Sequence, residues 1–203
     1  MKFTKVILAV FLALGCAAKR SSPSRVENND AAIEEDLSIE PELDCPTRDL
    51  PMGVELGDSM IPLRLPNSSG DQVALSDLCG SKAVLVISSA EWCAACRREF
   101  RIIALLAADW QDRGGKVYYS LFENNSNQPP RPENLAAWEE QMETWLGEVP
   151  FPVLGDPAKF LVNAVGGGTL PMAWVLDERL VIQYHGQGAS SDDIIPIMNE
   201  LLR

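Results

Sequence analysis

AVLVISSAEWCAACRREF, residues 83–100, carries the strongest structural signal in this chain. Its first part, Ala83 to Ile87, is a continuous apolar run, which is typical of a strand that is buried on both faces of a sheet. From Phe100 to Trp110, apolar side chains recur every three or four residues, which predicts a long helix. The sequence therefore predicts a buried strand that leads directly into a helix, with two cysteines at the junction.

The two cysteines, Cys93 and Cys96, have the spacing and context of a redox dithiol. A thiolate is the attacking species in disulfide exchange, and the free N–H groups and partial positive charge of a helix N-terminus favour a thiolate at Cys93. Cys96, one helical turn deeper, can then resolve a mixed disulfide at Cys93. Half of a zinc site is the alternative, but the chain has one histidine, His185, and only Cys45 and Cys79 to complete four sulfurs. We therefore expect no metal.

The rest of the globular sequence alternates strands with helices. Two arms of a hairpin are predicted at residues 61–65 and 72–75, around a turn at residues 67–71. Further strands are predicted at 117–122, 151–154, 172–176 and 181–184, and further helices at 133–145, 158–164 and from about residue 190. This order predicts a layered α/β fold.

Length and charge limit the possible functions. The chain has 203 residues and a hydrophobic content of 46%, which suits one domain with appended segments. Its formal net charge of −12 argues against a nucleic-acid partner.

Residues 1–15 have the layout of a secretory signal peptide. Lys2 and Lys5 flank the start of an apolar run that is too short to span a bilayer with ease. The stretch LALGC, which ends at Cys16, resembles a bacterial lipobox, and the resemblance implies that Cys16 is lipidated and becomes the mature N-terminus. We therefore expect a protein that is lipid-anchored in the bacterial cell envelope and faces the periplasm or the exterior. An ordinary cleaved signal is the alternative.

Residues 16–50 are predicted to be a disordered acidic tether. They are rich in Asp, Glu and Ser, and they offer too few apolar side chains to offset the entropy of ordering. From residue 51 to residue 203 the pattern is that of a globular domain.

The cysteine count supports export. Of the five cysteines, Cys16 is assigned to lipid, which leaves an even number. Cys45 and Cys79 are far apart in sequence, as the partners of a structural bridge in an oxidising compartment can be. We expect them to form a disulfide that pins the end of the tether to the domain.

Residues 55–203 resemble the TlpA-like branch of the thioredoxin family, which includes cytochrome-maturation thioredoxins. The matching motifs occur in the family's order at Gly57, Pro62, Leu75-Ser76-Asp77-Leu78, Trp92-Cys93-Ala94-Ala95-Cys96, Arg97-Arg98-Glu99-Phe100 and Leu170-Pro171-Met172-Ala173-Trp174. The resemblance implies a thioredoxin-like fold, in which helices flank a central mixed sheet. Here that fold would carry an N-terminal β-hairpin extension and a helical insertion.

The resemblance also implies roles for individual residues. Cys93 and Cys96 would be the catalytic dithiol, and Pro171, preceded by Leu170, would be a cis-proline that holds substrate backbone beside it. Glu99 aligns with a glutamate that shapes dithiol chemistry in cytochrome-maturation members. Because it follows Cys96 by three residues on a helix, it would shuttle a proton or restrain Cys96, and a solvated helix glutamate is the alternative. No cofactor is implied.

Four neighbouring residues complete the expected site. Trp92 is expected to shield one side of the dithiol, with core packing as the alternative. Ala94 and Ala95 stand where reducing thioredoxins have Gly-Pro, and because spacer identity tunes the reduction potential, the direction of electron flow stays open. Ile87 stands where cytosolic thioredoxins keep a buried aspartate, so that acid–base group is absent.

These features predict a membrane-tethered thiol:disulfide oxidoreductase that acts on exported proteins and depends on an upstream redox partner. A peroxidase on the same fold is one alternative, but Ala90 and Val86 occupy the places where that family carries a Thr or Ser and a Pro. A non-catalytic envelope binding module is the other, with Trp138, Trp145 and the proline loop at 129–132 as a docking face.

Overall fold

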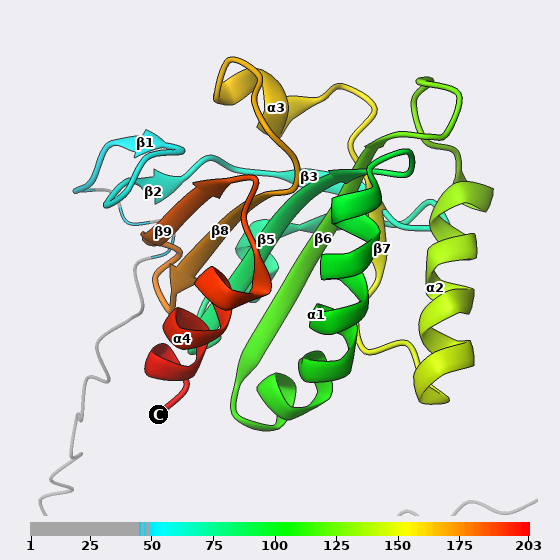
Figure 1. The fold of residues 1–203 in the computed structure, drawn as a ribbon. Coiled ribbons are helices and arrows are strands. Elements are labelled where there is room, and N and C mark those ends of the chain that lie inside the picture. Colours follow the sequence, from blue (N-terminus) through cyan, green and yellow to red (C-terminus); the bar gives the residue numbers. More distant parts are fainter. Residues whose placement is uncertain (1–44, 46, 48) are drawn as a thin grey trace, which may run out of the picture. The chain divides into compact units, whose positions relative to one another are not determined.

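The computed structural model describes residues 45, 47 and 49–203 (Figure 1). The predicted signal peptide 1–15, the lipidation at Cys16 and most of the predicted tether 16–50 lie outside the described residues and stay predictions. Thr47 is buried, so globular packing reaches a few residues upstream of residue 51. None of the helices in the described part of the chain is both long and apolar enough to cross a bilayer.

Five strands form one mixed sheet in the order β7-β6-β5-β8-β9. Their bounds are β5 Ala83–Ala90, β6 Gly115–Glu123, β7 Val153–Gly155, β8 Met172–Asp177 and β9 Ile182–Gln187. β5 and β7 both run parallel to β6, whereas β8 runs antiparallel to its neighbours β5 and β9. The predicted α/β class with a central mixed sheet is confirmed.

In the described part of the chain, four α-helices accompany the sheet, and Figure 1 shows their arrangement. They are α1 Ala94–Asp112, α2 Pro132–Leu146, α3 Phe160–Ala164 and α4 Ser191–Leu201. α2 lies between β6 and β7 in the chain and is the predicted helical insertion. Its Trp138 is buried among the rings of Phe100 and Tyr119, so the alternative that made Trp138 part of a docking face is wrong.

The central strand β5 contributes side chains to two hydrophobic cores, because successive side chains of a strand point to opposite faces of the sheet. Leu85 and Ile87 pack into the core that α1, α2 and α4 cover. Val84 and Val86 pack into a second core on the other face. All eight residues of β5 are buried, as expected for an apolar run at the centre of a sheet.

The N-terminal elements and α3 cover the second face. Their bounds are β1 Met52–Gly53, β2 Ser59–Met60, β3 Arg64–Pro66, β4 Gln72–Ala74 and the 3₁₀ helix η1 Leu75–Leu78. β3 and β4 pair antiparallel and form the predicted hairpin extension. β3 begins at Arg64, later than predicted, since Pro62 has no N–H to contribute to a ladder. The parallel pair β1–β2 was not predicted, because two-residue strands leave no periodic pattern.

Two helix ends show how local chemistry sets the boundaries. α1 ends at Asp112, and Gly114 then takes a positive φ of 95°, which turns the chain into β6. α4 continues through Pro196, which forfeits one backbone hydrogen bond. Its first turn is held by the Asp193 carboxylate, which accepts hydrogen bonds from the N–H and the hydroxyl of Ser190.

Candidate active site

The C-x-x-C turn lies where β5 meets α1. β5 ends at Ala90 and α1 begins at Ala94, so Cys93 is the N-cap residue of the helix. Its backbone is extended, with φ −78° and ψ 104°, and its sulfur accepts the N–H of Cys96 over 3.1 Å. The first N–H groups of a helix have no intrahelical partners, so the sulfur at the N-cap satisfies one of them. The same N–H groups favour negative charge at that sulfur.

The two sulfurs of the dithiol differ in accessibility. They are joined in a disulfide, with 5.2 Å between the Cα atoms. Cys96 is fully buried, while Cys93 keeps 7% of its surface exposed. An incoming sulfur can therefore reach Cys93 first, and Cys96 is left to act from inside.

An apolar cluster surrounds the dithiol. Ala90 and Phe122 are buried in it with the two cysteines, and three partly buried residues pack against it: Ala95, Val162 and Leu170. The other spacer residue, Ala94, is exposed. The C-x-x-C turn, α3 and the segment before β8 therefore all contribute side chains to the apolar cluster around Cys93.

Pro171 lies beside this cluster. The Leu170–Pro171 peptide bond is cis, and the side chain of Leu170 packs against the dithiol cluster. The surrounding backbone is held by the segment that follows β9. Gly188 donates its N–H to the Thr169 carbonyl over 2.8 Å, and Ala189 donates its N–H to the Pro171 carbonyl over 3.0 Å.

Trp92 belongs to a hydrogen-bonded group that sequence reasoning missed. The residue is 43% exposed, which rules out the core-packing alternative, and its Nε1–H donates to Oε2 of Glu123 over 2.8 Å. Oε1 of the same carboxylate forms an ion pair with the ammonium of Lys159. The hydrogen bond from Lys159 is the main cause that holds the pKa of Glu123 below its usual range; burial opposes it, and the hydrogen bond from Trp92 adds a smaller lowering effect.

Only the pairing of β5 with β6 brings Glu123 to the dithiol turn. The two strands are in register at Ala90 and Glu123, where the ladder has a bulge, and the N–H of Glu91 donates to the Glu123 carbonyl. Trp92 and Glu123 are 31 residues apart, a separation that no local sequence pattern relates.

Asp156 was also missed, and it holds α3 in place beside the site. Its buried carboxylate accepts the N–H of Phe160 over 2.9 Å and the N–H of Leu161 over 3.3 Å, so it caps the helix N-terminus. Burial raises the pKa of this carboxyl, although the backbone hydrogen bonds oppose the rise. The available signal was an aspartate shortly before a short apolar helix, a pattern common to many caps.

Glu99 is buried on α1, so the alternative of a solvated helix glutamate is wrong. Its Oε2 accepts the backbone N–H of Ser191 over 2.7 Å, and its Oε1 accepts Nε–H of Arg98 over 3.1 Å. Ser191 is the first residue of α4, 92 residues further along the chain. The carboxylate therefore joins the dithiol helix to α4.

Cys45 and Cys79 are joined in a second disulfide, with Cα atoms 6.0 Å apart. The four sulfurs of the zinc alternative are thus divided between two disulfides. Within the part of the chain that the structure describes, no group of three or more His, Cys, Asp or Glu side chains is arranged to hold a metal ion.

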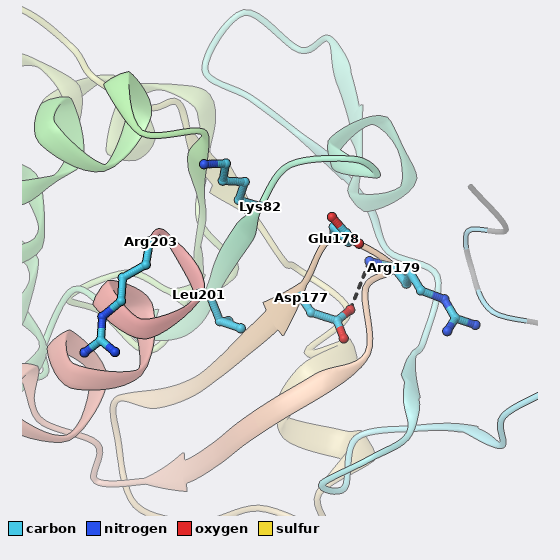
Figure 2. Close-up of a pocket in the computed structure, with 6 residues that line it drawn as sticks. All are labelled: Lys82, Asp177, Glu178, Arg179, Leu201 and Arg203. Atoms are coloured by element: carbon cyan, nitrogen blue, oxygen red, sulfur yellow. Dashed lines mark hydrogen bonds between the residues drawn. The ribbon is translucent and has the colours of Figure 1, made fainter. Parts of the chain in front are cut away.

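A separate hollow of about 370 Å³ includes Lys82, which precedes β5, whereas the dithiol follows the other end of that strand. Figure 2 shows the side chains that line the hollow. The hollow is lined by Lys82, Asp177, Glu178, Arg179, Leu201 and Arg203. Asp177 is already engaged there, because its Oδ1 accepts the N–H groups of Arg179 and Val181 and its Oδ2 accepts Nε2–H of Gln183. The carboxylate fixes the turn between β8 and β9, and we assign no chemistry to the hollow.

Residues 56–185 match the AhpC/TSA family. The chain belongs to the AhpC/TSA family. This redoxin is a thioredoxin-like oxidoreductase, and the predicted membership of the redoxin and thioredoxin group is confirmed. The search of curated protein sequences finds no significant match.

Solved structures confirm the thioredoxin-like fold of the redoxin. The thioredoxin domain of a thiol-disulfide oxidoreductase from Bacteroides vulgatus is 17% identical, with a TM-score of 0.59 over 74% of this chain and 100% of that one. A peroxiredoxin 6 variant from Arenicola marina is 15% identical, with a TM-score of 0.58 over 73% and 74%. The exposed lipoprotein thioredoxin of Streptococcus pneumoniae is 21% identical, with a TM-score of 0.51 over 68% and 98%.

Proposed function

We propose that this redoxin is a thiol:disulfide oxidoreductase that exchanges disulfides with exported protein partners. The observation that carries the proposal is the division of the dithiol into two unlike sulfurs. Cys93 is the N-cap residue of α1 and keeps 7% of its surface exposed, whereas its partner Cys96 is fully buried. This is the arrangement that a nucleophile and a resolving thiol require.

The reaction follows from these positions. In the reduced protein, the Cys93 thiolate attacks one sulfur of a partner disulfide, forms a mixed disulfide and expels the second partner sulfur as a thiolate. Cys96, deprotonated, then attacks the Cys93 sulfur and expels the first partner sulfur. The partner gains two electrons as a dithiol, and the redoxin is left with the Cys93–Cys96 disulfide seen in the structure.

A second dithiol protein must return electrons to this disulfide if the redoxin works as a reductant, and a disulfide acceptor must remove them if it works as an oxidant. The direction depends on the reduction potential of the Cys93–Cys96 couple relative to its partners. The potential, measured against a glutathione or dithiothreitol series, decides between the two.

The site of action belongs to the same proposal. The signal-like residues 1–15 and the lipobox-like stretch that ends at Cys16 support a lipid anchor in the cell envelope, with the domain facing the periplasm or the exterior. A neighbour of the same fold is the exposed lipoprotein thioredoxin of Streptococcus pneumoniae. In a bacterial host, the wild-type chain should fractionate with membranes and carry a lipid mass on its N-terminal peptide, and Cys16→Ser should lose both.

Disulfide exchange is preferred over peroxide reduction because of the residues around Cys93. Val86 and Ala90 are fully buried and apolar, so neither supplies the hydroxyl or the proline that the peroxidase family carries at those places. Peroxide consumption by the reduced protein at a rate that exceeds its exchange with protein disulfides would favour the peroxidase.

Two matched variants test the exchange mechanism. Cys93→Ser should abolish the reduction of insulin disulfides, because it removes the accessible nucleophile. Cys96→Ser should retain the attack and accumulate mixed disulfides that dithiothreitol releases, because the resolving sulfur is gone. Unchanged insulin reduction by Cys93→Ser would contradict the proposal. Retained partner binding with both cysteines changed to serine would instead favour a non-catalytic binding module.

A further inference from the structure

Glu99 makes a buried contact that the exchange mechanism does not use. Its side chain is only 5% exposed, and its Oε2 accepts the N–H of Ser191 over 2.7 Å. The other contact is to Arg98, whose side chain is 69% exposed, so solvent screens that ion pair. The bond to Ser191 is therefore the stronger constraint on the Glu99 carboxylate.

Ser191 presents an N–H group that needs an acceptor. It is the first residue of α4, where no earlier helical carbonyl is available, and it is 7% exposed. The neighbouring N–H of Ser190 is taken by Asp193. Glu99 supplies the missing acceptor from another helix, and its negative charge is favoured at the N-terminus of α4.

The segment 188–191 also holds the backbone around Pro171. Ala189, two residues before Ser191, donates its N–H to the Pro171 carbonyl over 3.0 Å. One end of this short segment is thus bonded to the Pro171 backbone, and the other end is bonded to α1 through Glu99. Since α1 also carries the dithiol, Glu99 helps to set where the Pro171 backbone lies relative to the dithiol.

We propose that Glu99 is a positioning residue that orients the Pro171 backbone toward Cys93 by accepting the N–H of Ser191. It acts through an acceptor oxygen and not by transferring a proton to Cys96. The inference rests on the proposed function, because it takes the backbone beside Pro171 as the place where a protein substrate docks. The two roles differ chemically, since positioning needs only an oxygen lone pair, whereas proton transfer needs a carboxyl that ionises.

The variants Glu99→Gln and Glu99→Ala separate these roles. Gln keeps a carbonyl oxygen that can accept the Ser191 N–H but cannot ionise, and Ala leaves that buried N–H without an acceptor. We expect Glu99→Ala to raise KM for insulin about tenfold, a typical effect of one lost buried hydrogen bond. Glu99→Gln should restore KM to within about twofold of the wild type on the same reasoning.

Two further readouts do not depend on substrate docking. The rate and pH profile of Cys93 alkylation by iodoacetamide should be unchanged in both variants, because a small reagent does not need the Pro171 backbone. Hydrogen exchange of the amides in segment 188–191 should accelerate in Glu99→Ala and stay slow in Glu99→Gln. If Glu99→Ala does not fold, the comparison of Glu99→Gln with the wild type still decides between positioning and proton transfer.

Loss of turnover in Glu99→Gln at unchanged KM, with a shifted alkylation profile, would assign proton transfer to Glu99 and overturn the inference. Equal KM values for insulin in the wild type and in folded Glu99→Ala would also overturn it. Failure of the proposed function looks different, because the wild type itself would then leave insulin disulfides intact.

Discussion

The Cys45–Cys79 disulfide offers a quantitative test of how the domain is held together. The bond closes a loop with a sequence separation of 34 residues. In the chain-entropy description, a loop of this length restricts the unfolded chain enough to stabilise the native state by about 4 kcal/mol. The loop contains β1 to β4 and η1, which cover one face of the sheet. We therefore predict that breaking the bond lowers the free energy of unfolding by about that amount.

The assay needs a variant in which Cys45–Cys79 is the one disulfide that Cys45, Cys79, Cys93 and Cys96 can form. Cys93→Ser with Cys96→Ser provides it, and denaturant unfolding is followed with and without dithiothreitol. Adding Cys45→Ser and Cys79→Ser should reproduce the effect of the reductant, which controls for the substitutions themselves. Each single serine variant should cost about as much as the pair, because either change breaks the same bond.

If neither the reductant nor the paired substitution changes the free energy of unfolding by more than about 0.5 kcal/mol, the reasoning is refuted. In the chain-entropy description, opening a loop of this length cannot have so small an effect on stability. A peptide map made without reductant supplies an independent check. It should recover the segments around Cys45 and Cys79 as one linked species, and recovery of two free thiols would remove the premise.

Three further predictions concern the core and the pH response. Phe100→Ala should lower stability by about 3–5 kcal/mol in thermal or denaturant unfolding, since the ring is buried among aromatic neighbours, whereas Leu105→Ala, exposed on the same helix, should cost little. Because the pKa of Asp156 is raised, the contribution of this group to stability is full below the ordinary aspartate pKa and is lost as pH rises through the raised value. The wild type should therefore lose stability relative to Asp156→Asn over that pH range, and parallel plots of unfolding free energy against pH for the two proteins would contradict this. The lowered pKa of Glu123 has the opposite effect on stability: the stabilising contribution of Glu123 is present above the ordinary glutamate pKa and is lost as pH falls through the lowered value. Because Glu123 accepts a hydrogen bond from Trp92, its protonation should change the tryptophan fluorescence of the wild type but not that of Trp92→Phe.

Much of the fold could be predicted because its signals are local. The apolar run at residues 83–87 and the helical spacing from Phe100 to Trp110 each depend on side chains a few positions apart. The Cys93–Cys96 pair is local in the same way, because residues three apart on a helix share a face. The start of β3 was misplaced where a single residue, Pro62, interrupted an otherwise good strand pattern.

The contacts around the dithiol could not be predicted, because they join elements that are distant in the chain. Trp92 meets Glu123 only through the register of two parallel strands, and Lys159 reaches the same carboxylate from the segment before α3. Glutamate and lysine are common on protein surfaces, so composition does not indicate this contact.

The sequence by itself determined the alternation of strands and helices and the place of two cysteines at a helix start, since backbone preference and side-chain periodicity act over a few residues. Only the tertiary structure decided that Cys96 is fully buried while Cys93 keeps a small exposed area, and that Glu99 binds Ser191 of α4. Burial and hydrogen bonding between distant segments depend on how the sheet and helices pack, which no short stretch of the chain encodes.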